Sequence, residues 1–163
     1  MATPHTTTLS SPLGPLRLFD RGNGLCGLYF PEHRRAPTFG DAVEDPTRFE
    51  HVRHGLASYL AGDATTFEVD LDLQGTDLQV QVWEQLLRVP HGEITSYGEV
   101  ARRIGRPSAV RAVAAAIGRN PVSIVVPCHR VVGADGRLTG YAGGLERKRW
   151  LLHHEGITIP APG

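Results

Sequence analysis

Alternating apolar and polar residues mark two parts of the first half of the chain. Leu16 and Leu18 flank a polar residue, and a second alternating stretch follows the turn signal at residues 21–24. Because side chains of an extended chain point alternately to opposite faces, residues 6–30 are expected to form short antiparallel strands. Residues 65–73 alternate in the same way, which predicts a further strand with one solvated face.

Helical spacing appears between these two parts. Residues 46–61 place their apolar side chains on one face of a helix, and Gly62 follows as a stop signal. Residues 31–45 are rich in proline, glycine and charged side chains, so a loop is expected there. Together the strands and the helix predict a small α/β unit that ends near Gly75, with Cys26 as a packing residue on the second strand.

The second half of the chain has the spacing of helices. Thr76 and Gln79 form a capping-box pattern, which predicts a helix that begins at Asp77. A last helix is expected over residues 145–154, before Gly156. The expected buried face of the helix that begins at Asp77 consists of Leu78, Val82, Trp83, Leu86 and Leu87.

A helix-turn-helix is predicted between these two helices. Ser96 and Glu99 form a second capping-box pattern, which indicates a short helix over residues 97–105. A turn follows, and Ser108 is expected to cap a third helix that runs over residues 109–117. Two short helices joined by a tight turn with glycine are typical of DNA-binding modules.

This order of elements predicts an α/β (α+β) fold with two domains. Residues 1–75 are expected to form a scaffold with a small antiparallel sheet and a helix. Residues 76–163 are expected to form a mainly helical domain that carries the helix-turn-helix. No apolar run is long enough to cross a membrane, and the first residues lack the features of a signal peptide. We therefore expect a cytoplasmic protein in which Cys26 and Cys128 stay reduced.

The zero net charge of the chain hides an asymmetry between its halves. Residues 77–155 carry eleven Lys or Arg side chains against seven Asp or Glu, whereas the rest carries six against ten. Ordinary surface scatter would account for this difference. The alternative is that the second half faces a polyanion, which would be attracted by the excess of positive charge.

The third predicted helix is rich in alanine, and Arg111 is its one long polar side chain. A helix that reads base edges in a major groove carries more side chains of that kind. The composition fits either a closely packed core helix or a smooth helix that lies in a DNA groove without reading sequence. In the second case Arg111 would enter the base stack. The DNA-facing residues would then be Ala109, Val110, Arg111, Ala112 and Ala114.

A cysteine with basic neighbours follows an apolar run, in the segment Pro127-Cys128-His129-Arg130. Most buried cysteines are inert, but a thiol beside a base or a cation is a candidate nucleophile because the thiolate is the reactive form. In an extended segment His129 points away from Cys128. Either the chain turns at Pro127, or a water molecule bridges the thiol and the imidazole.

Two residues after the cysteine each allow two interpretations. Tyr141 lies among glycines, so it forms either the wall of a pocket or the anchor of a loop. Glu155 follows the last helix, where an acidic group opposes the helix dipole. It is either a solvated end residue or the partner of another group, for which His129 is the candidate.

Taken together, these residues resemble the O6-alkylguanine-DNA alkyltransferases, also called methylated-DNA–protein-cysteine methyltransferases. The resemblance covers residues 76–156 well and residues 1–75 in layout only. The motifs that carry it are Ser96-Tyr97-Gly98-Glu99-Val100-Ala101, Arg111-Ala112-Val113, Asn120-Pro121, Val126-Pro127-Cys128-His129-Arg130-Val131-Val132 and Gly140-Tyr141-Ala142-Gly143-Gly144-Leu145.

The resemblance implies direct DNA repair with base flipping, in which Cys128 takes an alkyl group from O6 of guanine in double-stranded DNA. It implies that His129 acts on the thiol through a water molecule and that Glu155 orients His129. Tyr97 matches the tyrosine that rotates the phosphate of the flipped nucleotide and donates toward guanine N3. Asn120 matches the asparagine that ties the recognition helix to the active-site strand.

The same resemblance implies the contacts to DNA and to the flipped base. Arg111 matches the arginine that fills the space left by the base, in the minor groove. Tyr141 and the Ala142 N–H match groups around O6, and the Val131 carbonyl matches a contact to the exocyclic amine. Many members have serine at position 142, so the size of the pocket is expected to differ here. Some members bind zinc through N-terminal cysteines and histidines, but Cys26 is the only cysteine in that part of this chain, so no metal is expected.

No cofactor motif is present, and no residue type here cleaves a thioether, so one turnover per molecule and no cofactor are expected. Three other functions fit parts of this pattern: a lesion-binding protein without transfer, a transcription regulator and a thiol hydrolase with a Cys-His-Glu triad. The presence of Cys128 argues against the first, and the alanine-rich helix against the second. The protein is expected to act as a monomer. The range of alkyl groups, activity on O4-alkylthymine and clustering of copies on DNA stay open.

Overall fold

The computed structural model describes residues 3–32 and 41–159, which form two compact units. One unit consists of Met1–Gln74 with Pro121–Ser123, and the other of Gly75–Asn120 with Ile124–Gly163. The mixture of strands and helices confirms the predicted α/β (α+β) class. Residues 121–123 belong to the first unit, although they lie inside the range expected for the C-terminal domain. None of the described helices is both long and apolar enough to cross a lipid bilayer.

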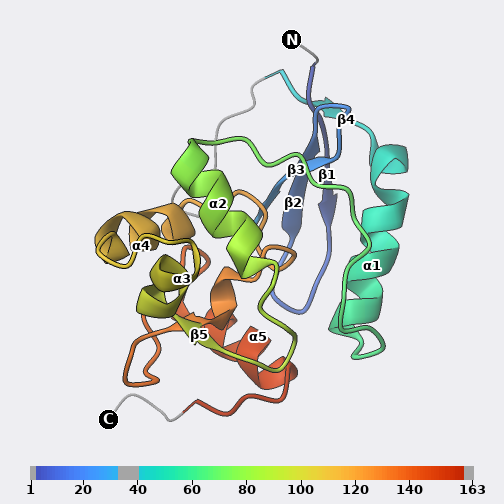
Figure 1. Ribbon diagram of the computed structural model, residues 1–163. Helices are drawn as coiled ribbons and strands as arrows, with labels where there is room; N and C mark the ends of the chain where they lie inside the picture. The colour runs from blue at the N-terminus through green and yellow to red at the C-terminus, as the bar shows by residue number, and fades with distance from the viewer. Residues whose placement is uncertain (1–2, 33–40, 160–163) are drawn as a thin grey trace. The chain divides into compact units, whose positions relative to one another are not determined.

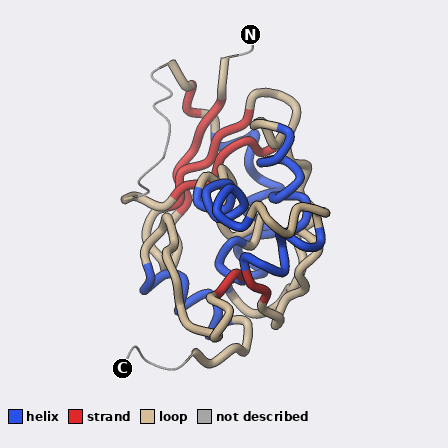
Figure 2. The backbone as a smooth tube through the Cα atoms, turned by 60° about the vertical axis from the view of Figure 1, so that its left-hand side comes forward, coloured by secondary structure: helices blue, strands red, loops and turns tan. Residues whose placement is uncertain are grey.

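The first unit is built on a four-stranded sheet with the order β3-β2-β1-β4. Figure 2 shows its strands running side by side in red. Strands β1 (His5–Leu9), β2 (Leu16–Asp20) and β3 (Leu25–Tyr29) are antiparallel neighbours. The prediction of antiparallel strands over residues 6–30 is therefore confirmed. The two-residue strand β4 (Val43–Glu44) pairs with β1 in parallel, within the expected loop 31–45.

Of that expected loop, residues 33–40 lie outside the described part of the chain. The predicted helix over 46–61 is confirmed with one change in its first turn. It begins as a 3₁₀ turn, η1 (Pro46–Phe49), and continues as α1 (Glu50–Leu60), which lies alongside the sheet in Figure 1. Asp45 caps the 3₁₀ turn by accepting a hydrogen bond from the Thr47 N–H.

The strand predicted over residues 65–73 is wrong. Only Leu71 bridges to Leu25, and the flanking hydrogen bonds join the Leu25 N–H to the Asp70 carbonyl and the Asp72 N–H to the Leu25 carbonyl. Alternation reports which side chains are half buried, and Phe67 does contact Tyr59, with ring centroids 5.0 Å apart. The backbone of most of the segment has no neighbouring strand, so it forms no ladder.

Beyond β3, the segment Pro121–Ser123 extends the sheet of the first unit by one bridge. The Leu28 N–H donates to the Pro121 carbonyl at 2.8 Å, and the Ser123 N–H donates to the Leu28 carbonyl at 3.1 Å. All five residues of β3 are buried, and Leu28 is fully enclosed. A stretch that is distant in sequence is thereby held as part of this unit.

The second unit is mainly helical and begins with α2 (Asp77–Leu86). The predicted capping box is confirmed, because the Gln79 N–H donates to Thr76 Oγ1 and the Thr76 N–H donates to Gln79 Oε1. Leu87 was expected on the buried face but is 42% exposed. The helix ends at Leu86, and Leu87 is its C-cap residue, where the packed face of the helix no longer continues.

The helix-turn-helix consists of α3 (Tyr97–Arg103) and α4 (Val110–Gly118). Ser96 caps α3 through the Glu99 N–H at 3.2 Å. The Glu99 side chain does not complete the expected box and pairs instead with arginines one turn later. The prediction that Ser108 caps the next helix is wrong, since α4 begins at Val110 and its N-cap has no side-chain hydrogen bond.

Trp83 fixes α4 against α2. Its indole N–H donates to the Ala116 carbonyl at 2.8 Å, and the ring is 2% exposed. Gly75 lies against the same ring, because a Cβ atom at this position would approach the indole to 2.7 Å. The close contact explains why glycine precedes the N-cap of α2.

The remaining elements of the second unit are one short pair of strands and one helix. Strands β5 (Thr95–Ser96) and β6 (Val131–Val132) pair in parallel. The last helix, α5 (Leu145–His154), has the predicted bounds, and Gly156 ends it with φ 86°. Leu151 and Leu152 on α5 are fully buried.

The Gly75 contact predicts a loss of stability on substitution. Gly75→Ala is expected to lower the free energy of unfolding by about 1–3 kcal/mol, because the methyl group overlaps the Trp83 ring. Urea unfolding followed by circular dichroism measures this change. The matched control is Gly98→Ala on α3, where a Cβ atom meets nothing within 4 Å and a gain of about 0.5–1 kcal/mol is expected. Equal effects at the two glycines would contradict the packing argument.

Candidate active site

Cys128 lies at a turn inside a fully buried segment, residues 122–132. Residues Cys128–Arg130 form a 3₁₀ turn, η2, directly after Pro127, and the thiol-bearing residue is 6% exposed. The chain therefore turns at Pro127, which is one of the two arrangements that the sequence predicts for the thiol and the imidazole. Ile124, four residues earlier, has φ 72°, a left-handed conformation that is rare for a β-branched residue.

The strand pair β5–β6 brings the start of α3 next to this turn. Val131 and Val132 follow the turn directly and pair with Thr95 and Ser96. Tyr97 is the next residue after β5 and the first of α3. Two segments more than thirty residues apart in sequence are thereby aligned, and Tyr97 and Cys128 are held in the same part of the second unit.

Polar groups surround the thiol in this apolar setting. Burial raises the pKa of the Cys128 thiol, while a hydrogen bond with Asn120, the charge of the Lys148 ammonium and a hydrogen bond with Tyr141 lower it. The Asn120 amide also donates to the Val126 carbonyl at 2.8 Å, which fixes its orientation. The thiol is thus protonated at rest and stands among groups that stabilise its thiolate.

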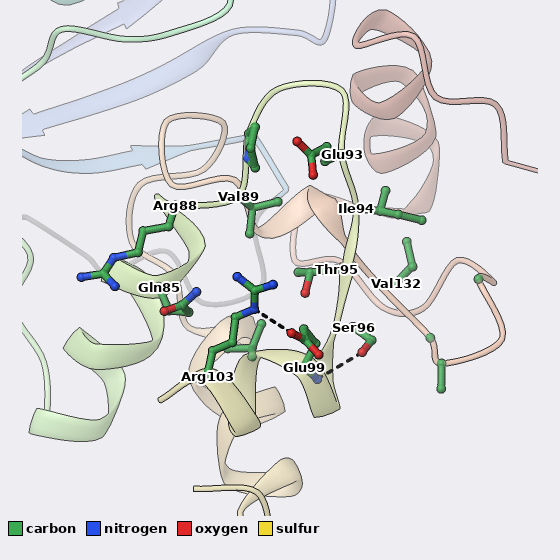
Figure 3. A pocket seen from close by; sticks show the side chains of 15 residues that line it. Gln85, Arg88, Val89, Glu93, Ile94, Thr95, Ser96, Glu99, Arg103 and Val132 are labelled. Carbon is green, nitrogen blue, oxygen red and sulfur yellow. Dashed lines mark hydrogen bonds and ion pairs between the residues drawn. The ribbon is translucent and has the colours of Figure 1, made fainter. Parts of the chain in front are cut away.

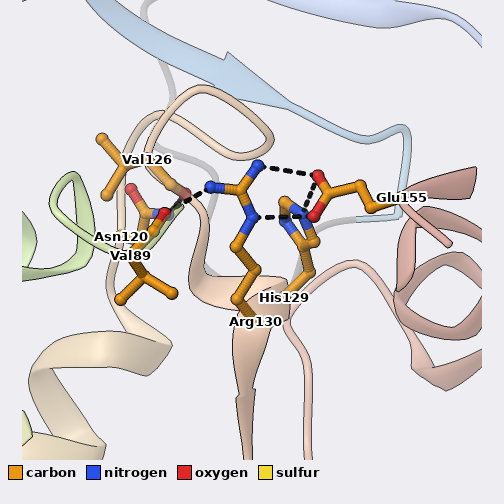
Figure 4. A network of polar contacts seen from close by, with 6 residues as sticks. All are labelled: Val89, Asn120, Val126, His129, Arg130 and Glu155. Carbon is orange, nitrogen blue, oxygen red and sulfur yellow. Dashed lines mark hydrogen bonds and ion pairs between the residues drawn. The ribbon is translucent and has the colours of Figure 1, made fainter. Parts of the chain in front are cut away.

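The carboxylate of Glu155 lies at the centre of a buried network, shown in Figure 4. It accepts hydrogen bonds from Arg130 Nε at 2.7 Å and Arg130 Nη2 at 2.8 Å, and from His129 Nε2 at 2.8 Å. The third guanidinium nitrogen, Nη1, donates to the Val89 carbonyl at 2.6 Å. Side chains of Glu155 and His129 are fully enclosed. Such a two-pronged guanidinium contact keeps the carboxylate ionised.

His129 is the neutral member of this network. Burial lowers its pKa, although the hydrogen bond and the charge of Glu155 act in the opposite direction. Because an ionised carboxylate only accepts, the Nε2 atom of His129 carries the proton and donates it to Glu155. The Nδ1 atom is buried and makes no hydrogen bond to any described residue. A basic nitrogen with a free lone pair therefore lies one residue from the thiol.

A second polar chain connects Tyr97 to Lys148. The Tyr97 hydroxyl and Thr139 Oγ1 are hydrogen-bonded at 2.6 Å. Lys148 Nζ donates to Thr139 Oγ1 at 3.4 Å, to the Thr139 carbonyl at 3.3 Å and to the Gly140 carbonyl at 3.4 Å. Lys148 is 1% exposed, and burial lowers its pKa to about 8 while the nearby Cys128 raises it.

The structure gathers the predicted residues into two groups. Asn120 and Tyr141 lie at Cys128, and Glu155 lies at His129. Val131 is buried in β6, and Ala142 is half-buried beside Tyr141. Arg130, Thr139 and Lys148 also belong to these groups, although the sequence patterns do not predict a role for them. Lys148 had a visible signal, since it is the only lysine of the chain.

The predicted DNA-facing residues lie on α4 and at its start. Val110, Arg111 and Ala112 are exposed, while Ala109 and Ala114 are half-buried. The opposite face of α4 is buried through Val113, Ala116 and Ile117. The helix consequently does both things that its composition allowed: it packs on one side and presents small side chains and Arg111 on the other.

One cavity of the second unit is separate from the thiol. It has a volume of about 460 Å³ and lies between the end of α2, the start of α3 and the segment after β6. Figure 3 shows the Glu99–Arg103 pair and the Ser96 cap at its wall. Neither Cys128 nor His129 lines it, so this cavity is not the space around the candidate nucleophile.

Comparisons with known proteins point in one direction. A family model described as 6-O-methylguanine DNA methyltransferase, ribonuclease-like domain, matches residues 5–73. A second, described as 6-O-methylguanine DNA methyltransferase, DNA binding domain, matches residues 77–157. The two models together cover most of the chain.

Individual relatives are similar over almost their whole length. A methylated-DNA–protein-cysteine methyltransferase of Mycobacterium tuberculosis is 49% identical over 157 residues, which are 96% of this chain and 95% of that protein. One from Methanosarcina mazei is 46% identical over 148 residues, 90% of this chain and 94% of that protein. The crystal structure of Mycobacterium tuberculosis OGT in complex with DNA superposes with TM-score 0.90 and 49% identity, covering 93% of both chains.

Removal of the Glu155 charge is expected to destabilise the fold strongly. Glu155→Gln leaves the buried Arg130 without its anion, which is expected to cost about 3–5 kcal/mol of unfolding free energy. The matched control is Glu99→Gln, because Glu99 also pairs with arginines but its side chain is 26% exposed; a loss below about 1 kcal/mol is expected there. Chemical denaturation of both variants measures the contrast, and similar losses would contradict the assigned burial.

His129 is expected to be neutral and protonated on Nε2 at neutral pH. The pKa of His129 is lower in the folded protein than in the unfolded chain, where it is about 6.5. Neutral His129 therefore contributes fully to stability above pH 6.5, and this contribution is lost as the pH falls toward the folded-state pKa. Two-dimensional ¹H–¹⁵N NMR of the imidazole rings reports both the tautomer and the titration midpoint. Glu155→Gln should lower the His129 midpoint further, because the Glu155 anion raises it. A His129 midpoint above the ordinary histidine value of about 6.5 would refute the assignment.

Proposed function

The chain belongs to the 6-O-methylguanine DNA methyltransferase family, and we propose that Cys128 is the residue that accepts the alkyl group. The protein repairs DNA by direct reversal, moving an alkyl group from DNA to one of its own cysteines. Its two cysteines differ in their surroundings. Cys26 is packed against Phe19 and Tyr29 in the sheet of the first unit, whereas Cys128 has hydrogen bonds with Asn120 and Tyr141 and the charge of Lys148 nearby. The polar surroundings of Cys128 support this choice.

Activation of the thiol runs through His129 in this proposal. A water molecule at the free Nδ1 atom takes the proton of Cys128 as it gives one of its own to the imidazole. Glu155 holds the opposite nitrogen at 2.8 Å and stabilises the imidazolium that results. Burial otherwise keeps the thiol protonated, so a base is needed before the sulfur becomes a nucleophile.

Transfer then proceeds as a displacement at the alkyl carbon. The thiolate of Cys128 forms a bond to that carbon while the bond to guanine O6 breaks. Tyr97 donates its proton to guanine N3, which neutralises the charge left on the base. The carbonyl of Val131, the N–H of Ala142 and the side chain of Tyr141 hold the flipped guanine. Alanine at position 142 supplies the same backbone N–H as serine and leaves a slightly larger pocket.

Binding to double-stranded DNA is assigned to α4. Its exposed surface combines small side chains with Arg111, which suits close approach to a groove without sequence reading. Arg111 occupies the space left by the flipped base. The solved relative that is 49% identical binds DNA. A protein that must find rare damaged bases in any sequence requires contacts of this kind.

The thioether on Cys128 is stable, so each molecule acts once and functions as a monomer on a single lesion. A free thiol of this kind needs a reducing compartment, which supports action inside the cell, on chromosomal DNA. A protein that binds the lesion without transferring the alkyl group is the second candidate, and the cysteine argues against it. Intact mass measurement separates the two.

The test incubates the protein with duplex DNA that contains O6-methylguanine and measures intact mass, followed by peptide mapping. One methyl group per molecule is expected on the Cys128 peptide, with none on the Cys26 peptide. Cys128→Ala should bind the duplex and gain no mass, while the matched control Cys26→Ala should gain one methyl group at the wild-type rate. Lesion-selective binding with unchanged mass in the wild type would establish the second candidate. Catalytic excess of repaired DNA over protein would overturn single turnover.

A further inference from the structure

Thr139 lies between Tyr97, the proposed proton donor to guanine, and Lys148, whose charge acts on the Cys128 thiol. Its hydroxyl is 2.6 Å from the Tyr97 hydroxyl and 3.4 Å from the Lys148 ammonium. Its methyl group lies against Gly133, where a Cβ atom would approach Thr139 Cγ2 to 3.3 Å. The side chain is thus held in one orientation, with the methyl group on Gly133 and the hydroxyl toward Tyr97 and Lys148.

We propose that Thr139 is a positioning residue that orients the proton of Tyr97 and relays a proton from Lys148 to replace it. This inference rests on the proposed function, in which Tyr97 protonates guanine N3. Thr139 and Lys148 act through Tyr97 and do not touch the reacting atoms in this scheme.

The direction of the relay follows from the chemistry of its members. A lysine ammonium only donates, so Thr139 Oγ1 accepts from Lys148. The hydroxyl hydrogen of Thr139 is then free to point to the Tyr97 oxygen, which accepts it. The Tyr97 hydrogen is left to point elsewhere, toward a base. A Tyr97 hydroxyl without Thr139 would have no such preferred direction.

The charges of the site balance along the same path. The Tyr97 O–H bond breaks as an N–H bond forms at guanine N3. Thr139 passes its proton to the Tyr97 oxygen and takes one from Lys148 Nζ. The Cys128 thiolate loses its negative charge when the S–C bond forms. Lys148 loses its positive charge when its N–H bond breaks. His129 keeps the proton that it took from Cys128. The net charge of the site is therefore unchanged, because Lys148 loses one positive charge and His129 gains one, and no acid from solvent is needed.

Lys148 suits the role of proton source. An arginine does not release a proton in proteins, whereas a buried lysine does so readily. Every other basic residue among the 17 Lys and Arg of this chain is an arginine, and the one lysine is the one that is 1% exposed at this site. Its three long contacts of 3.3–3.4 Å hold the ammonium loosely. Burial lowers its pKa to about 8, which makes it a stronger acid than a solvated lysine.

The experiment compares two DNA duplexes, one with O6-methylguanine and one with O6-methyl-3-deazaguanine, whose C–H group at position 3 takes no proton. Single-turnover rates of methyl transfer are measured at saturating protein. Thr139→Ala is expected to slow transfer from O6-methylguanine about tenfold, a part of the effect of a general acid. Thr139→Ser, which keeps the hydroxyl, should stay within about twofold of wild type. On the 3-deaza substrate wild type and Thr139→Ala should react equally slowly.

Controls separate the relay from a packing role and from the proposed function. Thr158→Ala, at an exposed threonine of the same unit, should match wild type on both duplexes. DNA affinity and the rate of Cys128 alkylation by iodoacetamide should be unchanged in Thr139→Ala. Equal slowing on both substrates, failure of serine to restore the rate, or equal wild-type rates on the two substrates would each overturn the relay. Absence of any methyl transfer by wild type would instead overturn the proposed function.

Discussion

The buried carboxylate of Glu155 is the interaction on which the rest of the site depends. Three hydrogen bonds from Arg130 and His129 converge on it in a fully enclosed position. The guanidinium satisfies its charge, so the imidazole can remain neutral, and the imidazole is fixed in the tautomer that leaves Nδ1 basic. The Glu155 carboxylate therefore holds the turn that carries Cys128 and also determines which nitrogen of His129 carries a proton. Arg130 further connects this turn to the segment that follows α2, through the Val89 carbonyl.

Desolvation governs the chemistry around this anchor. A buried thiol resists ionisation, which protects it from adventitious alkylation, and the same burial makes each nearby hydrogen bond stronger once a thiolate forms. The site meets both demands with neutral donors, Asn120 and Tyr141, and a single cation, Lys148. The two neutral donors stabilise the anion without adding a further buried charge to that of Lys148. The Cys128 thiol is therefore unreactive while it is protonated and becomes a nucleophile when a base removes its proton.

Local patterns predicted the local parts of this architecture. The Thr76 capping box, the last helix and the cysteine motif involve neighbours in sequence, so periodicity and residue type are sufficient to find them. The pattern over residues 65–73 was misleading because alternation reports side-chain burial, whereas a strand also requires a neighbour for its backbone. Thr139 and Lys148 were missed for a related reason. Thr139 and Lys148 become part of the site only because the fold brings the Tyr97 hydroxyl, forty-two residues before Thr139, to the Thr139 hydroxyl.

Ile124 shows how such a site is held in shape. Its left-handed backbone costs an isoleucine about 1–2 kcal/mol relative to an ordinary conformation, and glycine would avoid that cost. The side chain is fully buried, and burial of an isoleucine contributes about 1.5–3 kcal/mol. The two quantities nearly cancel, so the bend is enforced by side-chain packing rather than by backbone preference. Substitution of Ile124 is consequently limited by the volume of its side chain. A smaller apolar residue would keep the cost of the left-handed backbone and lose the packing energy that offsets it.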